Sequence, residues 1–232
     1  MNATVLGVIP ARIGSSRLPR KPLFPIAGRP LIEWVWRRAV GLAVFDHVVV
    51  ATDDDEVARV CRGFGAEVRV TDPAHPSGTD RVAEVARDPA YRGFPTVVNV
   101  QGDEPFLLAE HARAAAALVS GGEWELGTVA TPIRARDEWM EPSVVKVVRG
   151  DDGAALLFSR APVPHPRDGE PDFTGTLFLR HVGLYTYTRE ALQRWVGLPE
   201  GALERVERLE QLRPLAAGMR MGVAVGAPAE GG

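Results

Sequence analysis

The stretch Val8-Ile9-Pro10-Ala11-Arg12-Ile13-Gly14-Ser15-Ser16-Arg17-Leu18-Pro19-Arg20-Lys21-Pro22-Leu23 joins an apolar run to a basic loop. The run, Val5–Pro10, predicts a buried β-strand close to the N-terminus. The loop carries four cations and no acidic residue: Arg12, Arg17, Arg20 and Lys21. Gly14 permits a close backbone approach, and guanidinium and ammonium groups suit a polyanion such as a triphosphate. The stretch therefore predicts a phosphate-binding loop, with a basic surface loop braced by prolines as the alternative.

Short apolar strands alternate with helical patterns through residues 5–100. The predicted strands are Val5–Pro10, His47–Ala51, Glu67–Val70 and Thr96–Val100. The predicted helices between them are Pro30–Leu42, Asp54–Gly63 and Thr79–Arg87. This alternation is typical of parallel strands that are joined by right-handed crossovers. We therefore expect an α/β fold with a Rossmann-like, doubly wound and mostly parallel sheet.

The same topology predicts where a ligand binds. In doubly wound sheets, ligands collect outside the carboxyl ends of the strands. Three distinctive loops follow predicted strands on that side of the sheet, at residues 11–22, 71–80 and 101–106. We expect these three loops to form one site.

The pattern changes after about Thr131. Ser143–Arg149 and Ala154–Phe158 are predicted to pair across residues 150–153, and a proline-rich segment at 162–172 is predicted to be extended. Val182–Tyr187 then returns as a strand. Because no linker composition interrupts the chain, we expect one domain over residues 1–232, with an inserted arm at about 132–187.

Two carboxylates follow the predicted strand at Thr96–Val100, in the segment Asn99-Val100-Gln101-Gly102-Asp103-Glu104-Pro105. Magnesium takes hard oxygen ligands, often one or two carboxylates together with substrate phosphates. Asp103 is therefore a candidate magnesium ligand. The alternative is structural, with Asp103 capping a predicted helix at Leu107–Ser120.

The segment His75-Pro76-Ser77-Gly78-Thr79-Asp80-Arg81 precedes and opens a predicted helix. Thr79 and Asp80 are good N-cap residues, which predicts a structural role. The side chain of Ser77, Gly78 and the early helix N–H groups are equally suited to face a nucleotide base. Both roles can hold together.

Composition excludes some partners and leaves others open. The chain has 232 residues and a net charge of −3, which gives no overall attraction to nucleic acid or to an anionic membrane. Cys61 is the single cysteine, so no disulfide can form within the chain. The first residues show no charged n-region and no apolar signal-sequence pattern, and no apolar run in the sequence reaches membrane length. We expect a cytoplasmic protein that binds no nucleic acid and does not insert into a membrane.

The quoted motifs together resemble those of sugar-activating nucleotidyltransferases, and most closely the 3-deoxy-manno-octulosonate cytidylyltransferases, or CMP-Kdo synthetases. The resemblance runs from Val8 to about Val225 and includes three further segments, at Ser159–Pro164, Arg180–Tyr185 and Leu209–Arg213. It implies transfer of CMP from CTP to Kdo for lipopolysaccharide synthesis, with Mg²⁺ as cofactor and a homodimer formed with the help of the arm. The family's usual form has glycine where this chain has Arg20.

The resemblance implies roles for individual residues. The catalytic set is Arg12, Lys21 and Asp103, and Asp103 is the metal ligand. The residues implied to bind CTP are Ala11, Arg12, Gly14, Ser15, Ser16, Arg17, Lys21, Ser77, Gly78, Thr79, Arg81 and Gln101. Those implied to bind the sugar acid are Gln101, Arg160, Arg167, His181, Tyr185, Glu210 and Gln211. By its local pattern alone, Leu209–Arg213 is predicted to lie in a helix.

The resemblance fails at the C-terminus. The family normally continues with a D-T-P-E-D-like segment that holds a second aspartate ligand, and Pro228-Ala229-Glu230-Gly231-Gly232 does not match it. We therefore expect either a truncated sequence or an incomplete metal site. Two other functions stay open: a cytidylyltransferase for a sialic-type sugar acid, and a homologue that binds nucleotide or sugar with impaired catalysis.

Overall fold

The computed structural model describes residues 4–14 and 18–228. Within these ranges, nine strands form one sheet whose main path is β11-β7-β10-β6-β1-β4-β5. The strands of this path are β1 (Val5–Pro10), β4 (His47–Thr52), β5 (Glu67–Val70), β6 (Thr96–Val100), β7 (Leu126–Pro132), β10 (Leu179–Thr188) and β11 (Met221–Val225). The pairs β1–β4, β1–β6, β4–β5 and β7–β11 are parallel, whereas β10 runs antiparallel to both β6 and β7. The expected mostly parallel sheet is confirmed.

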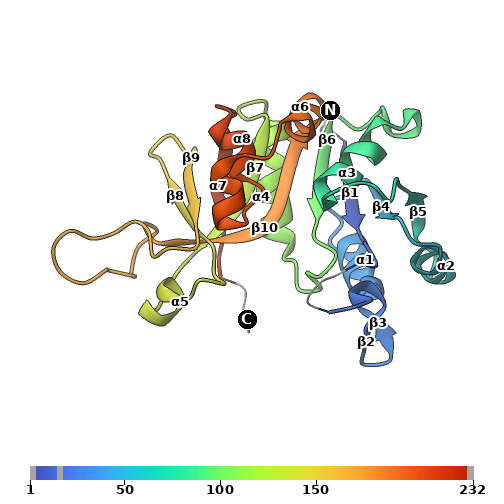
Figure 1. Ribbon diagram of the computed structural model, residues 1–232, viewed down its shortest axis with the longest axis horizontal. Coiled ribbons are helices and arrows are strands. Elements are labelled where there is room, and N and C mark those ends of the chain that lie inside the picture. The colour runs from blue at the N-terminus through green and yellow to red at the C-terminus, as the bar shows by residue number, and fades with distance from the viewer. Residues whose placement is uncertain (1–3, 15–17, 229–232) are drawn as a thin grey trace.

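Helices cover both faces of this sheet (Figure 1). One face packs against α1 (Leu31–Gly41), α2 (Asp55–Gly63) and α4 (Ala109–Ser120). The other packs against α3 (Gly78–Arg87), α6 (Arg189–Gly197) and α8 (Leu212–Ala216), and α7 (Ala202–Glu207) lies next to α8. Side chains alternate along β1, so that Leu6 and Val8 face α3 while Val5 and Ile9 face α1. An apolar run buried on both faces is what the sequence of β1 predicted.

The arm projects from one side of the sheet (Figure 1, yellow and orange). Its strands are β8 (Lys146–Arg149), which pairs with β10, and β9 (Ala155–Ser159), which pairs with β8. The predicted hairpin is therefore confirmed, with a shorter first strand. Elements not predicted from the sequence include β2 (Pro25–Ile26), β3 (Arg29–Pro30), β7, β11, α6 and α7. No helix in the described ranges is long and apolar enough to cross a bilayer.

Candidate active site

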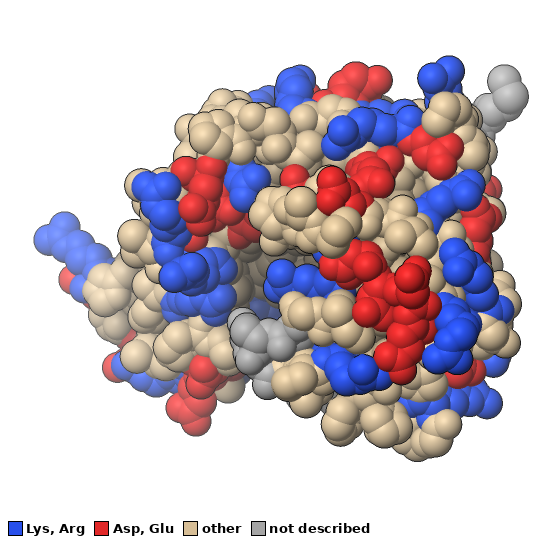
Figure 2. Space-filling model, turned by 45° about the vertical axis from the view of Figure 1, so that its right-hand side comes forward, with Lys and Arg blue, Asp and Glu red and all other residues tan. Residues whose placement is uncertain are grey.

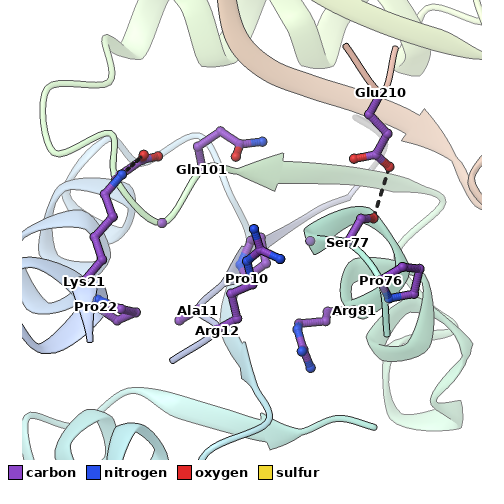
Figure 3. A pocket seen from close by; sticks show the side chains of 13 residues that line it. Pro10, Ala11, Arg12, Lys21, Pro22, Pro76, Ser77, Arg81, Gln101 and Glu210 are labelled. Atoms are coloured by element: carbon purple, nitrogen blue, oxygen red, sulfur yellow. Dashed lines mark hydrogen bonds and ion pairs between the residues drawn. The ribbon is translucent and has the colours of Figure 1, made fainter. Parts of the chain in front are cut away.

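The three predicted loops meet around one pocket of about 340 Å³ (Figure 3). It lies at the carboxyl ends of β1 and β6, which are neighbours in the sheet. Its lining comes from Pro10, Ala11, Arg12, Lys21, Pro22, Pro76, Ser77, Gly78, Arg81, Gln101, Gly102, Asp103 and Glu210. The space-filling view shows a hollow in this face with basic side chains at its edge (Figure 2). The predicted meeting of the three loops at this edge of the sheet is confirmed.

Gly102 holds two of the loops together, and the sequence analysis did not single it out. A Cβ at this position would lie 2.5 Å from the carbonyl oxygen of Pro10. Only a residue without a side chain therefore lets the loop after β6 approach the end of β1 so closely. This contact sets the distance between Arg12, which follows β1, and Asp103, which follows β6.

Two cations enter the pocket from the first loop. Arg12 follows β1 directly, and Lys21 lies in the 3₁₀ turn Lys21–Leu23. The ammonium of Lys21 forms an ion pair with the carboxylate of Asp103 across the pocket (Figure 3). Ser15, Ser16 and Arg17 were also predicted to bind CTP; they lie outside the described residues.

Arg20 lies next to this pair but faces away from the pocket, because its guanidinium contacts Glu56 at 2.6 Å. Its backbone has φ 58° and ψ 29°, in the left-handed region. Glycine adopts this conformation without strain, and other residues seldom do. The glycine that the family usually has here is therefore explained by the backbone rather than by the phosphates.

Arg81 is almost fully buried and holds the pocket wall together. Its guanidinium contacts Asp53 at 2.6 Å, the hydroxyl of Thr71 at 2.9 Å and the carbonyl of Asp72 at 3.0 Å. These bonds tie the ends of β4 and β5 to α3. Among the described residues, its Nε is a buried polar atom with no protein partner.

Ser77 is the N-cap of α3, which corrects the prediction that Thr79 or Asp80 caps this helix. Its Oγ accepts from the backbone N–H of Thr79 at 3.1 Å and of Asp80 at 3.3 Å. The cap falls on Ser77 because Gly78 already has helical geometry, which leaves Ser77 as the last extended residue. Thr79 is buried inside the first turn.

Glu210 reaches the same pocket from the far end of the chain. Its carboxyl lies 3.1 Å from Ser77 Oγ, and burial raises its pKa above the ordinary value (Figure 3). The prediction that Glu210 and Gln211 lie in a helix is wrong, because α7 ends at Glu207 and α8 begins at Leu212. Both residues instead form part of a turn that aims Glu210 into the pocket and buries Gln211.

His181 and Tyr185 lie together on β10, with ring centres 5.2 Å apart. Thr128 Oγ1 donates to the carbonyl of Leu184 at 2.7 Å and lies 2.9 Å from His181 Nε2. Since the hydroxyl has one proton, Nε2 must donate to it, so the neutral ring keeps the lone pair on Nδ1. Burial lowers the pKa of His181 to about 3 and raises that of Tyr185.

The two arginines implied to bind the sugar acid do not line the pocket. Arg160 Nε donates to the carbonyl of Glu207 at 2.7 Å, and its Nη1 donates to that of Pro142 at 3.0 Å. Arg167 lies in the loop after β9, with a side chain that is 95% exposed. In this structure Arg160 braces the base of the arm, and Arg167 faces solvent.

Asp103 is not the cap of the following helix, since α4 begins at Ala109 with Leu108 as its N-cap. The alternative structural role is therefore wrong. No group of three or more potential metal ligands occurs among residues 4–14 and 18–228. One pocket-lining carboxylate nevertheless suits magnesium, which keeps several waters and takes substrate phosphates as ligands. The neighbouring Glu104 has a raised pKa because of burial and the charge of Asp103.

Comparisons with known proteins agree with this geometry. A family model described as cytidylyltransferase matches residues 6–221. The 3-deoxy-manno-octulosonate cytidylyltransferase of Gemmatimonas aurantiaca is 50% identical over 229 residues, covering 98% of this chain and 88% of that protein. The one of Halorhodospira halophila is 49% identical over 223 residues, covering 94% and 86%. The solved structure of CMP:2-keto-3-deoxy-manno-octonic acid synthetase complexed with CTP has a TM-score of 0.89 at 38% identity, covering 99% of this chain and 92% of that one.

Proposed function

This chain belongs to the cytidylyltransferase family, among the 3-deoxy-manno-octulosonate cytidylyltransferases, and on that premise we propose how its pocket performs the reaction. The chain is a nucleotidyltransferase that transfers CMP from CTP to the anomeric hydroxyl of Kdo and releases pyrophosphate. The observation that carries the assignment of residues is the meeting of three loops around one basic pocket.

Arg12 and Lys21 bind the triphosphate. The sugar hydroxyl attacks the α-phosphorus in line and loses its proton to solvent. The bond to the bridging oxygen breaks, and that oxygen leaves with pyrophosphate. Negative charge moves onto the leaving group during this step, and preorganised cations stabilise it without reorganisation. The α3 N-terminus at Ser77 and Gly78 binds the base, where backbone N–H groups can recognise a pyrimidine edge.

Asp103 would hold magnesium together with water and triphosphate oxygens. When bound, the metal neutralises phosphate charge and lowers the pKa of the attacking hydroxyl. Lys21 pairs with Asp103, and we expect CTP to draw the ammonium toward the phosphates, which leaves the carboxylate available to the metal. The ion pair thereby holds both side chains at the reacting end of the pocket before CTP binds.

The sugar acid binds beside the nucleotide, between Gln101 and the Glu210 turn. His181 lines an adjoining cavity that shares Gln101 with this pocket, and Tyr185 contacts the His181 ring on β10. Buried polar groups of this kind reject ligands that leave them unpaired, because such groups lose their hydration without compensation.

We also propose a homodimer formed through the arm. Among the described strands β9 pairs with β8 alone, which leaves one edge open. Leu156 on β9 and Leu177 in the arm loop have exposed fractions of 63% and 64%. Apolar side chains on an open edge strand are a liability unless a partner covers them. We also propose that the enzyme works in the cytoplasm.

A pyrophosphate-release assay with magnesium tests the activity. With Kdo as acceptor, the rate of pyrophosphate release with CTP should exceed the rate with UTP by about tenfold to a few hundredfold, because a buried polar mismatch costs ~1–3 kcal/mol. ATP should be a still poorer substrate, since the purine ring system is larger. Turnover with N-acetylneuraminate in place of Kdo would instead identify a sialic-type enzyme. Binding of CTP without release of pyrophosphate with either acid would identify an impaired homologue.

A further inference from the structure

The turn that presents Glu210 is held by an ion pair that the reaction itself does not use. α7 ends at Glu207, Arg208 has a left-handed backbone with φ 55°, and α8 begins at Leu212. Within this span the backbone makes few internal bonds, of which Leu212 N–H to Leu209 and Arg213 N–H to Glu210 close the turn. Leu209 N–H also bonds to the Glu204 carbonyl at 3.3 Å, so side chains add to a small number of backbone bonds in setting the direction of the turn.

Glu204 on α7 and Arg213 on α8 join across the turn. Arg213 Nε donates to Glu204 Oε2 at 2.8 Å, and its Nη2 donates to Oε1 at 2.6 Å. The two side chains are 9% and 12% exposed, so the pair is nearly dry. Glu204 Oε2 also accepts from the N–H of Gly201 at 3.3 Å, which fixes the start of α7.

A buried ion pair contributes little net stability by itself. Desolvation offsets much of the attraction, and apolar side chains of similar volume often stabilise a protein equally well. The planar fork does, however, fix both distance and orientation between the two helices. The pair thus has properties that suit positioning better than stabilisation.

Resting on the proposed function, we propose that Glu204 and Arg213 are positioning residues for the sugar half of the site, because they aim Glu210 at the acceptor. The nucleotide half has further contacts of its own. Ser77, which faces Glu210, is held independently by the N–H groups of Thr79 and Asp80 and by the carboxylate of Asp80 at 2.7 Å. Loss of the pair should therefore weaken sugar binding and spare CTP binding.

The test measures KM for Kdo and for CTP separately in Glu204→Gln, Arg213→Lys and the double variant Glu204→Met/Arg213→Met. The double variant replaces the pair by apolar groups and should keep the melting temperature near that of the wild type. Glu125→Gln is the matched control, because Glu125 forms an equally short but exposed pair with Arg194 at 2.6 Å. A misplacement of a substrate-positioning group by about 1 Å can lower catalytic efficiency by up to ~100-fold. We therefore expect the KM for Kdo to rise about tenfold to a hundredfold.

Support consists of a raised KM for Kdo, a CTP KM within about twofold of wild type, and no rescue in the thermally stable double variant. Arg213→Lys should be intermediate, since it keeps the charge but loses the fork. Equal changes in both KM values, unchanged values, or rescue by the apolar pair would overturn the proposal.

If the wild type makes no CMP-Kdo, the proposed function fails. Amide exchange over residues 205–216 then decides the positioning question: faster exchange in Glu204→Gln supports it, and unchanged exchange overturns it.

Discussion

At the scale of single residues, two neighbours in one loop have opposite tasks. Lys21 faces the pocket and pairs with Asp103, whereas Arg20 faces outward and pairs with Glu56. The positive charges of this loop therefore differ in role from residue to residue, although the sequence shows only a cluster of cations. Substituting the two residues one at a time therefore distinguishes a cation that contacts substrate from a cation at the surface.

Lys21→Ala should lower turnover by about 10²–10³, because a preorganised contact to developing charge is lost. The melting temperature should stay near the wild-type value, since the side chain is partly exposed and its ion pair is at the surface. Steady-state kinetics with CTP and Kdo give the measurement. Arg20→Ala is the control and should retain most of the activity; near-normal turnover in Lys21→Ala would contradict the assignment.

The left-handed backbone at Arg20 gives a second prediction. Arg20→Gly and Arg20→Ala both lose the contact to Glu56, but only glycine relieves the backbone strain. The glycine variant should therefore melt about 2–4 °C above the alanine variant. Thermal unfolding monitored by circular dichroism measures the difference. An alanine variant that melts at the same temperature or higher would show that this conformation is not strained.

At the scale of elements, the site depends on how closely two strand ends approach each other. Gly102→Ala would place a methyl group 2.5 Å from the Pro10 carbonyl, so the loop after β6 must move. We expect turnover to fall about tenfold to a hundredfold and the melting temperature to drop. Gly63→Ala, where a Cβ meets no atom within 4 Å, should leave both nearly unchanged. Full activity in Gly102→Ala would mean that the loop spacing is not critical.

Strand β10 carries a pH dependence through His181. Its pKa is about 3 in the folded state against an ordinary 6.5, so between these values the unfolded chain binds a proton that the folded chain does not. The free energy of unfolding must therefore fall as the pH drops from 6.5 toward 3. His181→Gln should make this fall shallower in melting curves, whereas His165→Gln, at an exposed histidine, should not. Parallel pH profiles for wild type and His181→Gln would refute the burial argument.

At the scale of the whole molecule, the open edge of β9 predicts association. Size-exclusion chromatography with light scattering should give twice the chain mass of 25.1 kDa. Leu156→Lys should shift the protein to monomer, because a charge would enter the apolar contact. Val40→Lys, on α1 and away from the arm, should leave the dimer intact (Figure 1). A wild-type monomer at micromolar concentration would contradict the proposed interface.

The sequence by itself determined the elements that depend on local periodicity and the site that depends on topology. Strands β1, β5 and β6 begin and end where the sequence predicted. β1 and β6 are mostly apolar because they are buried on both faces, whereas β5 lies at the edge of the sheet and alternates polar with apolar residues. The order of strands and helices then placed three loops at the carboxyl ends of parallel strands. Much of the nucleotide pocket was therefore predictable from short segments.

Only the tertiary structure decided the contacts between segments that are distant in the chain. The sequence showed Arg81 and Arg160 as available cations, whereas the fold engages them with Asp53 and with the Glu207 carbonyl. The helical pattern around Glu210 did not reveal a turn, since tertiary contacts can override local propensity. Periodicity reports which face of an element is buried. Which partner a buried polar group meets depends on desolvation and geometry that exist only once the chain has packed.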